Sequence, residues 1–156
     1  TSIAAAVNTP TTAEFRTALN NAIAQMLSFV DDQGQVMALG QSGLIVAVPP
    51  SMALVAAEAL KSTLVGGGNT NVLQGIAQLA VFPHIASEKD RFYLCKTDVA
   101  VRPFVFLDRE PITFDAMEAG SEVAFREERY EYGVRGRYTM TFGHWSFCVR
   151  TVFSLT

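Results

Sequence analysis

The stretch Leu44-Ile45-Val46-Ala47-Val48-Pro49-Pro50 decides the fold expected of this chain. Its first five residues are apolar and rich in β-branched side chains, which predicts a strand buried on both faces. The two prolines end the strand, and proline is well suited to begin a helix because its missing N–H would be unpaired there anyway. Residues 51–63 follow, rich in alanine and with Glu58 and Lys61 as their charges, so they predict a closely packed helix. Strand, Pro-Pro and helix together indicate an α/β unit on a sheet.

A longer helix is expected before this unit. Residues 12–30 carry apolar side chains at helical intervals, namely Phe15, Leu19, Ile23, Met26, Leu27 and Val30. Thr11 and Glu14 have the spacing of a capping box, and the turn-forming run Asp-Asp-Gln-Gly at residues 31–34 predicts the end of the helix. Its polar face carries Asn and Gln instead of Lys and Arg, so it predicts packing against the protein and does not require a membrane.

The second half of the chain is typical of β-structure. Residues 66–71, Gly-Gly-Gly-Asn-Thr-Asn, predict a flexible loop. Strands are predicted over residues 75–82, 91–95, 103–107 and 138–153, with Gly143 as a bulge or a point of close approach. Residues 123–132 alternate only in part and carry many charges, so they predict an exposed or interfacial strand or a short helix. The fold class is therefore α+β, with helices mostly first and strands mostly later.

The composition favours a protein that assembles with other subunits. The 156 residues fit one domain or two small lobes that share a core. Hydrophobic residues make up 49% of the chain and charged residues 17%, and the mean hydropathy is +0.23. Because few charges are available to cover a free surface, some apolar area is expected to meet another protein.

The charge, the hydropathy and the N-terminal residues argue against a nucleic-acid-binding, a membrane-spanning or a secreted protein. A net charge of −3 argues against non-specific nucleic-acid binding. No apolar run reaches the roughly 18 residues needed to cross a bilayer. The chain opens on Thr-Ser-Ile, without a methionine or a signal peptide, which indicates a trimmed or proteolytic product.

Candidate catalytic and metal-binding residues are few. Cys95 and Cys148 lie far apart in apolar, strand-like segments and are expected to be buried free thiols in a reducing compartment. The cysteines and histidines match no zinc-ligand spacing. The glycine triplet at residues 66–68 follows a predicted helix and precedes a predicted strand, which is the reverse of a phosphate-binding loop.

The two histidines are candidate catalytic groups. His84 has Ser87, Glu88 and Asp90 nearby, but linear proximity does not bring these groups together as Ser-His-acid catalysis requires. His144, beside Trp145, is expected to be packed or interfacial. We therefore predict no catalytic, cofactor-binding or metal-binding residue, and no enzyme.

Two charged segments are candidates for contacts between subunits. Asp108-Arg109-Glu110-Pro111 predicts either a hairpin turn or an inter-subunit ion pair. A mixed cluster follows, made of Glu122, Arg126, Glu127, Glu128, Arg129, Glu131, Arg135 and Arg137. Matched charges of both signs suit a contact with a like subunit, where they set register and partner choice, although a solvated face is the alternative.

Taken in order, the segments resemble the Mu-like prophage major head subunit family. The resemblance rests on the strand–Pro-Pro–helix unit, a Gly-to-Pro strand, aromatic and Pro-apolar strands, an Arg-acid-Pro segment and a closing Tyr-Gly…Gly-His-Trp pattern. These are residues 44–63, 75–83, 92–94, 102–106, 109–111, 132–137 and 142–145. The closing motif departs from the family, with Val134-Arg135 in place of an acidic residue and Tyr138-Thr139 in place of an Asn-Ala pair.

The resemblance implies the tailed-phage major capsid fold, which is Hong Kong 97-like, with an axial and a peripheral lobe. Residues 31–110 would form the axial-type lobe, and residues 1–30 and 111–156 would contribute to the peripheral-type lobe. The chain would then be a C-terminal fragment, residues 1–156, that lacks the N-terminal arm and extended loop of whole members and is monomeric or weakly associated.

The implied function is that of a capsid subunit. Copies would assemble in the bacterial host cytoplasm into hexamers and pentamers of an icosahedral virion shell that encloses DNA without binding it specifically, with scaffold and portal proteins as further partners. No membrane is implied. The candidate inter-subunit contacts are Gly67, Arg109, Glu110, Arg126, Glu128, Arg129, Arg135 and Arg137. The alternatives are an encapsulin-like compartment shell, a tail or head-completion protein, and a small α/β enzyme with an unrecognised site.

Overall fold

The computed structural model describes residues 2–5, 10–37, 39–117, 125–126 and 130–155. The chain divides into two compact units, each described by itself. We call them the sheet unit, Thr1–Pro103 with His144–Thr156, and the hairpin unit, Phe104–Gly143.

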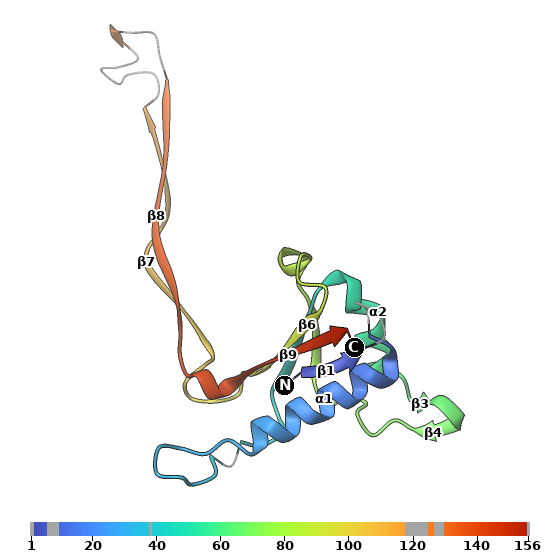
Figure 1. Ribbon diagram of the computed structural model, residues 1–156. Coiled ribbons are helices and arrows are strands. Elements are labelled where there is room, and N and C mark those ends of the chain that lie inside the picture. The colour runs from blue at the N-terminus through green and yellow to red at the C-terminus, as the bar shows by residue number, and fades with distance from the viewer. Residues whose placement is uncertain (1, 6–9, 38, 118–124, 127–129, 156) are drawn as a thin grey trace. The chain divides into compact units, whose positions relative to one another are not determined.

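A five-stranded mixed sheet forms the centre of the sheet unit, in the order β1-β9-β6-β2-β5 (Figure 1). Its strands are β1 (Ser2–Ala5), β2 (Leu44–Val48), β5 (Gln78–Val81), β6 (Arg91–Lys96) and β9 (Cys148–Leu155). β1 pairs with β9 and β2 with β5 in parallel, whereas β6 runs antiparallel to both β2 and β9. The mixture of helices with a sheet of both pairing types is the predicted α+β class.

Two helices pack on this sheet through one core. They are α1 (Thr12–Leu27) and α2 (Ala53–Lys61). The ring of Phe15 in α1 lies 4.9 Å from that of Phe92 in β6 and 6.4 Å from that of Phe153 in β9. The buried face of α2 consists mainly of alanine, which allows close packing on the same core.

The predicted start of α1 is confirmed in detail. Thr11 is the N-cap, and its side chain accepts a hydrogen bond from the Glu14 backbone while the Glu14 carboxylate accepts one from the Thr11 backbone. The helix ends at Leu27, earlier than predicted, because Val30 forms a β-bridge with Val36 across the predicted turn.

The deciding stretch forms the predicted strand, although Ile45 and Ala47 on one of its faces are only half-buried. β2 covers residues 44–48 and lies between β5 and β6, so its backbone is paired on both sides. Pro49 and Pro50 end it, and a short 3₁₀ turn, η1 (Pro50–Met52), leads into α2. Proline at the start of this turn removes an N–H that would have no helical partner.

The predicted loop at residues 66–71 contains regular structure. Two short strands, β3 (Leu64–Val65) and β4 (Asn69–Thr70), pair antiparallel, and η2 (Gly66–Gly68) joins them. The predicted loop is thus the turn of a short hairpin, its flexibility remains a prediction, and we call residues 64–70 the glycine hairpin. Gly67 has φ +83°, a conformation that side chains with a Cβ rarely adopt, which explains a glycine at this turn.

The hairpin unit is a long antiparallel ribbon of β7 (Phe104–Met117) and β8 (Glu131–Phe142) (Figure 1). The strand predicted at residues 103–107 is only its beginning. The turn predicted at residues 108–111 is wrong, because those residues lie within β7. The register shifts between Asp108 and Glu110 and again between Glu110 and Thr113. Pro111 lies in this irregular part, where a missing N–H is tolerated.

The strand predicted over residues 138–153 is two strands. β8 ends at Phe142, and η4 (Trp145–Phe147) precedes β9. The break falls at Gly143, where a bulge was predicted. Strand β5 is shorter than predicted and is followed by η3 (Pro83–Ile85). Of the segment predicted at 123–132, residues 123–124 and 127–129 lie outside the described part of the chain.

The compact units divide the chain differently from the predicted lobes. Helix α1 shares its core with β2 and β6. The assignment of segments to axial and peripheral lobes remains a prediction.

Candidate assembly surface

The hairpin unit exposes a large apolar area. Every residue of β8 is exposed, and so are the described side chains of β7 apart from the half-buried Glu110. A two-stranded hairpin by itself is marginally stable in water, and an extended apolar patch on a protein surface marks a contact with another protein. The large apolar side chains are Phe104, Val105, Phe106, Leu107, Ile112, Phe114, Tyr132, Val134, Tyr138, Met140 and Phe142. We call them the ribbon patch.

Aromatic side chains of the patch gather on one face near the base of the ribbon. Phe104 is opposite Phe142, with ring centroids 5.8 Å apart, and Phe106 lies 5.6 Å from Tyr138. Alternation along a strand places these four rings on the same face. Exposed aromatic rings held by the backbone lose little entropy when a partner covers them, and aromatic residues are enriched in interfaces for this reason.

Charged side chains occupy the middle of the ribbon. Glu110 contacts Arg135 with Oε1 to Nε at 3.6 Å and Arg137 with Oε2 to Nε at 3.5 Å. Arg135 also lies with Nη2 3.4 Å from Oδ2 of Asp115. Arg135 is 64% exposed and Arg137 66%, so these pairs add little stability. They lie where the register shifts, which suits a role in selecting the register of the two strands.

The structure thus brings together three of the predicted contact residues, Glu110, Arg135 and Arg137, within one hairpin. Arg109 is exposed beside them in β7, and Arg126 is exposed between the strands in sequence. Glu128 and Arg129 lie outside the described residues. An inter-subunit contact by any of these side chains remains a prediction.

Gly67, the remaining predicted contact, lies in the sheet unit at the turn of the glycine hairpin. Asn71 holds this hairpin against α2: its Nδ2 donates to the carbonyl oxygens of Ala59, at 2.8 Å, and Ser62, at 2.9 Å. Its Oδ1 accepts from the backbone N–H of Leu73. Asn71 is 3% exposed, and its importance was not predicted from the sequence, where it read as a loop residue.

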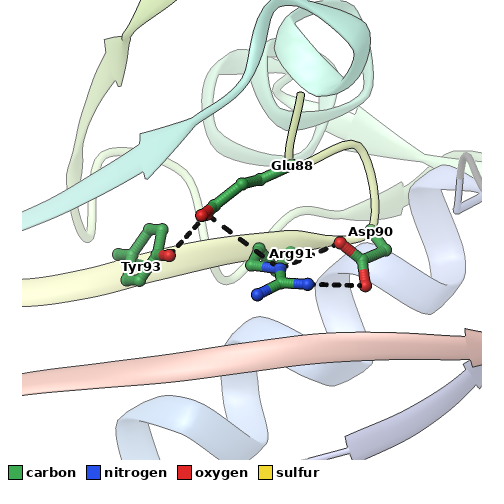
Figure 2. Close-up of polar contacts among 4 residues, drawn as sticks. All are labelled: Glu88, Asp90, Arg91 and Tyr93. Carbon is green, nitrogen blue, oxygen red and sulfur yellow. Dashed lines mark hydrogen bonds and ion pairs between the residues drawn. The ribbon is translucent and has the colours of Figure 1, made fainter. Parts of the chain in front are cut away.

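Acidic residues near His84 are engaged by neighbours on β6 (Figure 2). The Tyr93 hydroxyl donates to Glu88, and Arg91 donates to both oxygens of Asp90 at 2.9 and 3.2 Å. The bonds from Arg91 lower the pKa of Asp90, and burial, together with the bond to Glu88, raises the pKa of Tyr93. These contacts tie the start of β6 to the loop before it, which is a structural role.

His144 lies at the junction before η4. Its Nδ1 contacts the Ser146 hydroxyl, and its ring stacks beside Trp145, which packs edge-on against Phe29 at 5.4 Å. Trp145 is nevertheless 69% exposed. His144 is itself exposed, so it is not packed in the core, and an interfacial position remains a prediction.

Two findings limit the kinds of site in the described part of the chain. No group of three or more His, Cys, Asp or Glu side chains is placed there to hold a metal ion. None of its helices combines the length and the apolar character needed to cross a membrane.

The fold is that of phage capsid proteins. The chain aligns with a protein in "Capsid structure of the Cyanophage P-SCSP1u" with a TM-score of 0.65 and 12% identity, over 100% of this chain and 52% of that one. It also aligns with a chain of "Procapsid of bacteriophage JBD30", with a TM-score of 0.36 and 19% identity, over 89% of this chain and 40% of that one. The chain spans about half the length of the cyanophage capsid chain. The first alignment confirms the predicted capsid fold.

A family model described as Mu-like prophage major head subunit gpT matches residues 5–85 and 86–156. The chain therefore belongs to this family, and the resemblance seen in its motifs is confirmed. No curated protein sequence matches the chain.

Proposed function

We propose that this chain acts within the major head subunit of a phage or prophage, which self-assembles into the closed icosahedral shell around the DNA. The observation that carries the proposal is the ribbon patch: an apolar two-stranded ribbon whose aromatic face has no cover in the described chain. Many weak contacts of this kind, repeated around closed hexamers and pentamers, combine into a stable shell.

The finer parts of the proposal follow from the same reasoning. Assembly takes place in the host cytoplasm, with scaffold and portal proteins. The assembled shell encloses DNA without binding it specifically. The mixed signs of the ribbon charges, two arginines beside two carboxylates, support a contact with protein over a contact with phosphate.

The test is to express the complete gene and examine the product by negative-stain electron microscopy. We expect closed particles, and nuclease-protected DNA inside those made during phage growth. Closed particles filled with a host enzyme would favour an encapsulin-like shell, and open rings a head-completion protein. A strictly monomeric product of the complete gene under all assembly conditions would contradict the proposal.

A further inference from the structure

Strands β6 and β9 bring the two cysteines of the chain together. Cys95 and Cys148 are separated by more than 50 residues in sequence, but they are direct partners in the antiparallel register of these strands. Both are free thiols. The sequence holds no other cysteine, so a reaction of either thiol can be assigned without ambiguity.

The hydrogen-bond pattern shows which kind of pair they form. The N–H of Phe153 donates to the carbonyl of Asp90 at 2.7 Å, so residues 90 and 153 form a hydrogen-bonded pair. Hydrogen-bonded and non-hydrogen-bonded pairs alternate along an antiparallel ladder. Five steps along the ladder, Cys95 and Cys148 are therefore a non-hydrogen-bonded pair. Such pairs have Cα atoms about 4.5 Å apart, within the range that a disulfide spans.

The two thiols differ in accessibility and in ionisation. Cys95 is 8% exposed, whereas Cys148, at the start of β9, is half-buried. A hydrogen bond between the side chains raises the pKa of Cys95, with burial as a further cause, and the same bond lowers the pKa of Cys148. Cys148 is thus the more accessible and the more readily ionised thiol of the pair, and Cys95 is the buried thiol held beside it.

The location of the pair gives it a structural consequence. The chain leaves β6 after Lys96, runs through the hairpin unit, and returns to the sheet at Cys148. The pair therefore lies at the two positions between which the hairpin unit is inserted. A bond between the sulfurs would fix the ends of β6 and β9 to each other at that point.

We propose that Cys95 and Cys148 form a redox modification site whose co-reactant is a low-molecular-weight disulfide such as oxidised glutathione. The Cys148 thiolate attacks one sulfur of the small disulfide, and one small thiolate leaves. The Cys95 thiol then loses its proton and attacks Cys148 Sγ, which releases the second small thiolate. Two protein thiols are oxidised to one disulfide, and one small disulfide is reduced to two thiols. The inference goes beyond the proposed function and does not depend on it.

The test starts from the reduced wild-type chain, incubated with oxidised glutathione and then alkylated in the native and the denatured state. Intact-mass analysis should show that both thiols disappear together, in a chain that carries no glutathione and remains a monomer. The melting temperature should rise by about 5–10 °C, because the new bond closes a long loop in the unfolded chain. Reductant should reverse both changes.

Two variants separate the roles. Cys95→Ala leaves the accessible thiol without a partner, so it should accumulate a single glutathione on Cys148, the trapped intermediate. Cys148→Ser should react at least tenfold more slowly, since Cys95 is buried. Wild-type protein that keeps two free thiols, carries glutathione on both cysteines, or links only between chains would overturn the proposal. This readout needs no variant to fold.

Discussion

Lys96 is a charged residue that the fold buries. Its side chain is 4% exposed, and Nζ donates to the carbonyl oxygens of Gly40 and Ser42, at 2.9 and 2.8 Å, and contacts Asp98 Oδ1 at 2.6 Å. Each of the three N–H groups of the ammonium thus has a protein oxygen as its partner, as a buried charge requires. Ser42 also donates to Asp98, so the lysine at the end of β6 organises the loop before β2.

Replacing Lys96 by alanine should destabilise the sheet unit. The substitution leaves two carbonyl oxygens without their donor, so we expect the free energy of unfolding to fall by about 2–3 kcal/mol. Chemical denaturation followed by circular dichroism measures the change. Lys89→Ala, at an exposed position, is the matched control and should shift stability by less than about 0.5 kcal/mol. Equal effects of the two variants would contradict the role given to Lys96.

Asp98 makes the stability depend on pH. The hydrogen bond from Lys96, and then that from Ser42, lowers the pKa of Asp98 below its ordinary value. Because the folded-state pKa is lower than the unfolded one, this carboxylate stabilises the fold above the unfolded pKa, about 3.9. That stabilisation is lost as the pH falls through the folded-state pKa.

We therefore expect the melting temperature of the wild-type chain to decrease as the pH is lowered from about 5 to about 2.5. In Asp98→Asn the decrease should be smaller, because the group that binds the proton is gone. A thermal melt at each pH measures it. Parallel curves for the two proteins would show that Asp98 does not carry the effect.

At the scale of elements, local signals in the sequence predicted most of the fold. The Thr11–Glu14 capping box, the Pro-Pro stop after β2 and the apolar runs of β2 and β6 act over a few residues, so they could be read directly. Pro111 was misread as part of a turn, because a proline within a strand is tolerated only at a register irregularity, and such an irregularity depends on the partner strand. The ribbon β7–β8 was missed because its exposed apolar residues resemble those of a core strand.

Substitutions at two neighbouring glycines of the glycine hairpin distinguish an effect of added charge from an effect of backbone strain. An added Cβ at Gly66 meets no atom within 4 Å, and its φ is unstrained, whereas Gly67 has φ +83°. We propose that this hairpin faces the centre of each capsomer, the hexamer or pentamer of the shell, and therefore expect Gly66→Arg and Gly67→Arg both to impair capsomer formation by the complete subunit. Gly67→Ala should lower stability by about 1 kcal/mol and still assemble.

Particle yield by sedimentation and electron microscopy is the measurement. Normal assembly of both arginine variants would show that the glycine hairpin lies away from any subunit contact. A defect shared by Gly67→Ala would point to backbone strain as the cause.

The aromatic face of the ribbon should matter for assembly more than for folding. Phe106 and Tyr138 are 57% and 66% exposed, so the double change Phe106→Ser, Tyr138→Ser removes little buried area from the chain. We expect the melting temperature of the sheet unit to remain within about 2 °C and the yield of particles to fall at least tenfold. Leu54→Ser, at an 85% exposed position on α2, is the control. Equal yields for all three proteins would exclude the ribbon as the contact.

At the scale of the whole molecule, pairings between distant segments could not be read from the sequence. Cys95 and Cys148 each appeared as an isolated buried thiol, because their partnership depends on the register of two strands that flank a long insertion. The structural role of Asn71 likewise depends on its hydrogen bonds to carbonyl groups at the end of α2, which are distant in sequence. The candidate charges Glu110, Arg135 and Arg137 lie opposite one another in a single ribbon, which the sequence did not predict, and their contact with a second subunit remains a prediction.

The position of β9 has a consequence for synthesis on the ribosome. Among the described strands β9 comes last in sequence, but it lies between β1 and β6, so this sheet stays divided until residue 155 has been made. The β7–β8 ribbon is synthesised earlier, so its aromatic side chains are exposed while the five-stranded sheet is still incomplete. Closing a sheet by such distant pairing is slow. Nascent chains on one polysome are therefore most exposed to premature association during this interval, and a chaperone that binds aromatic segments would act then.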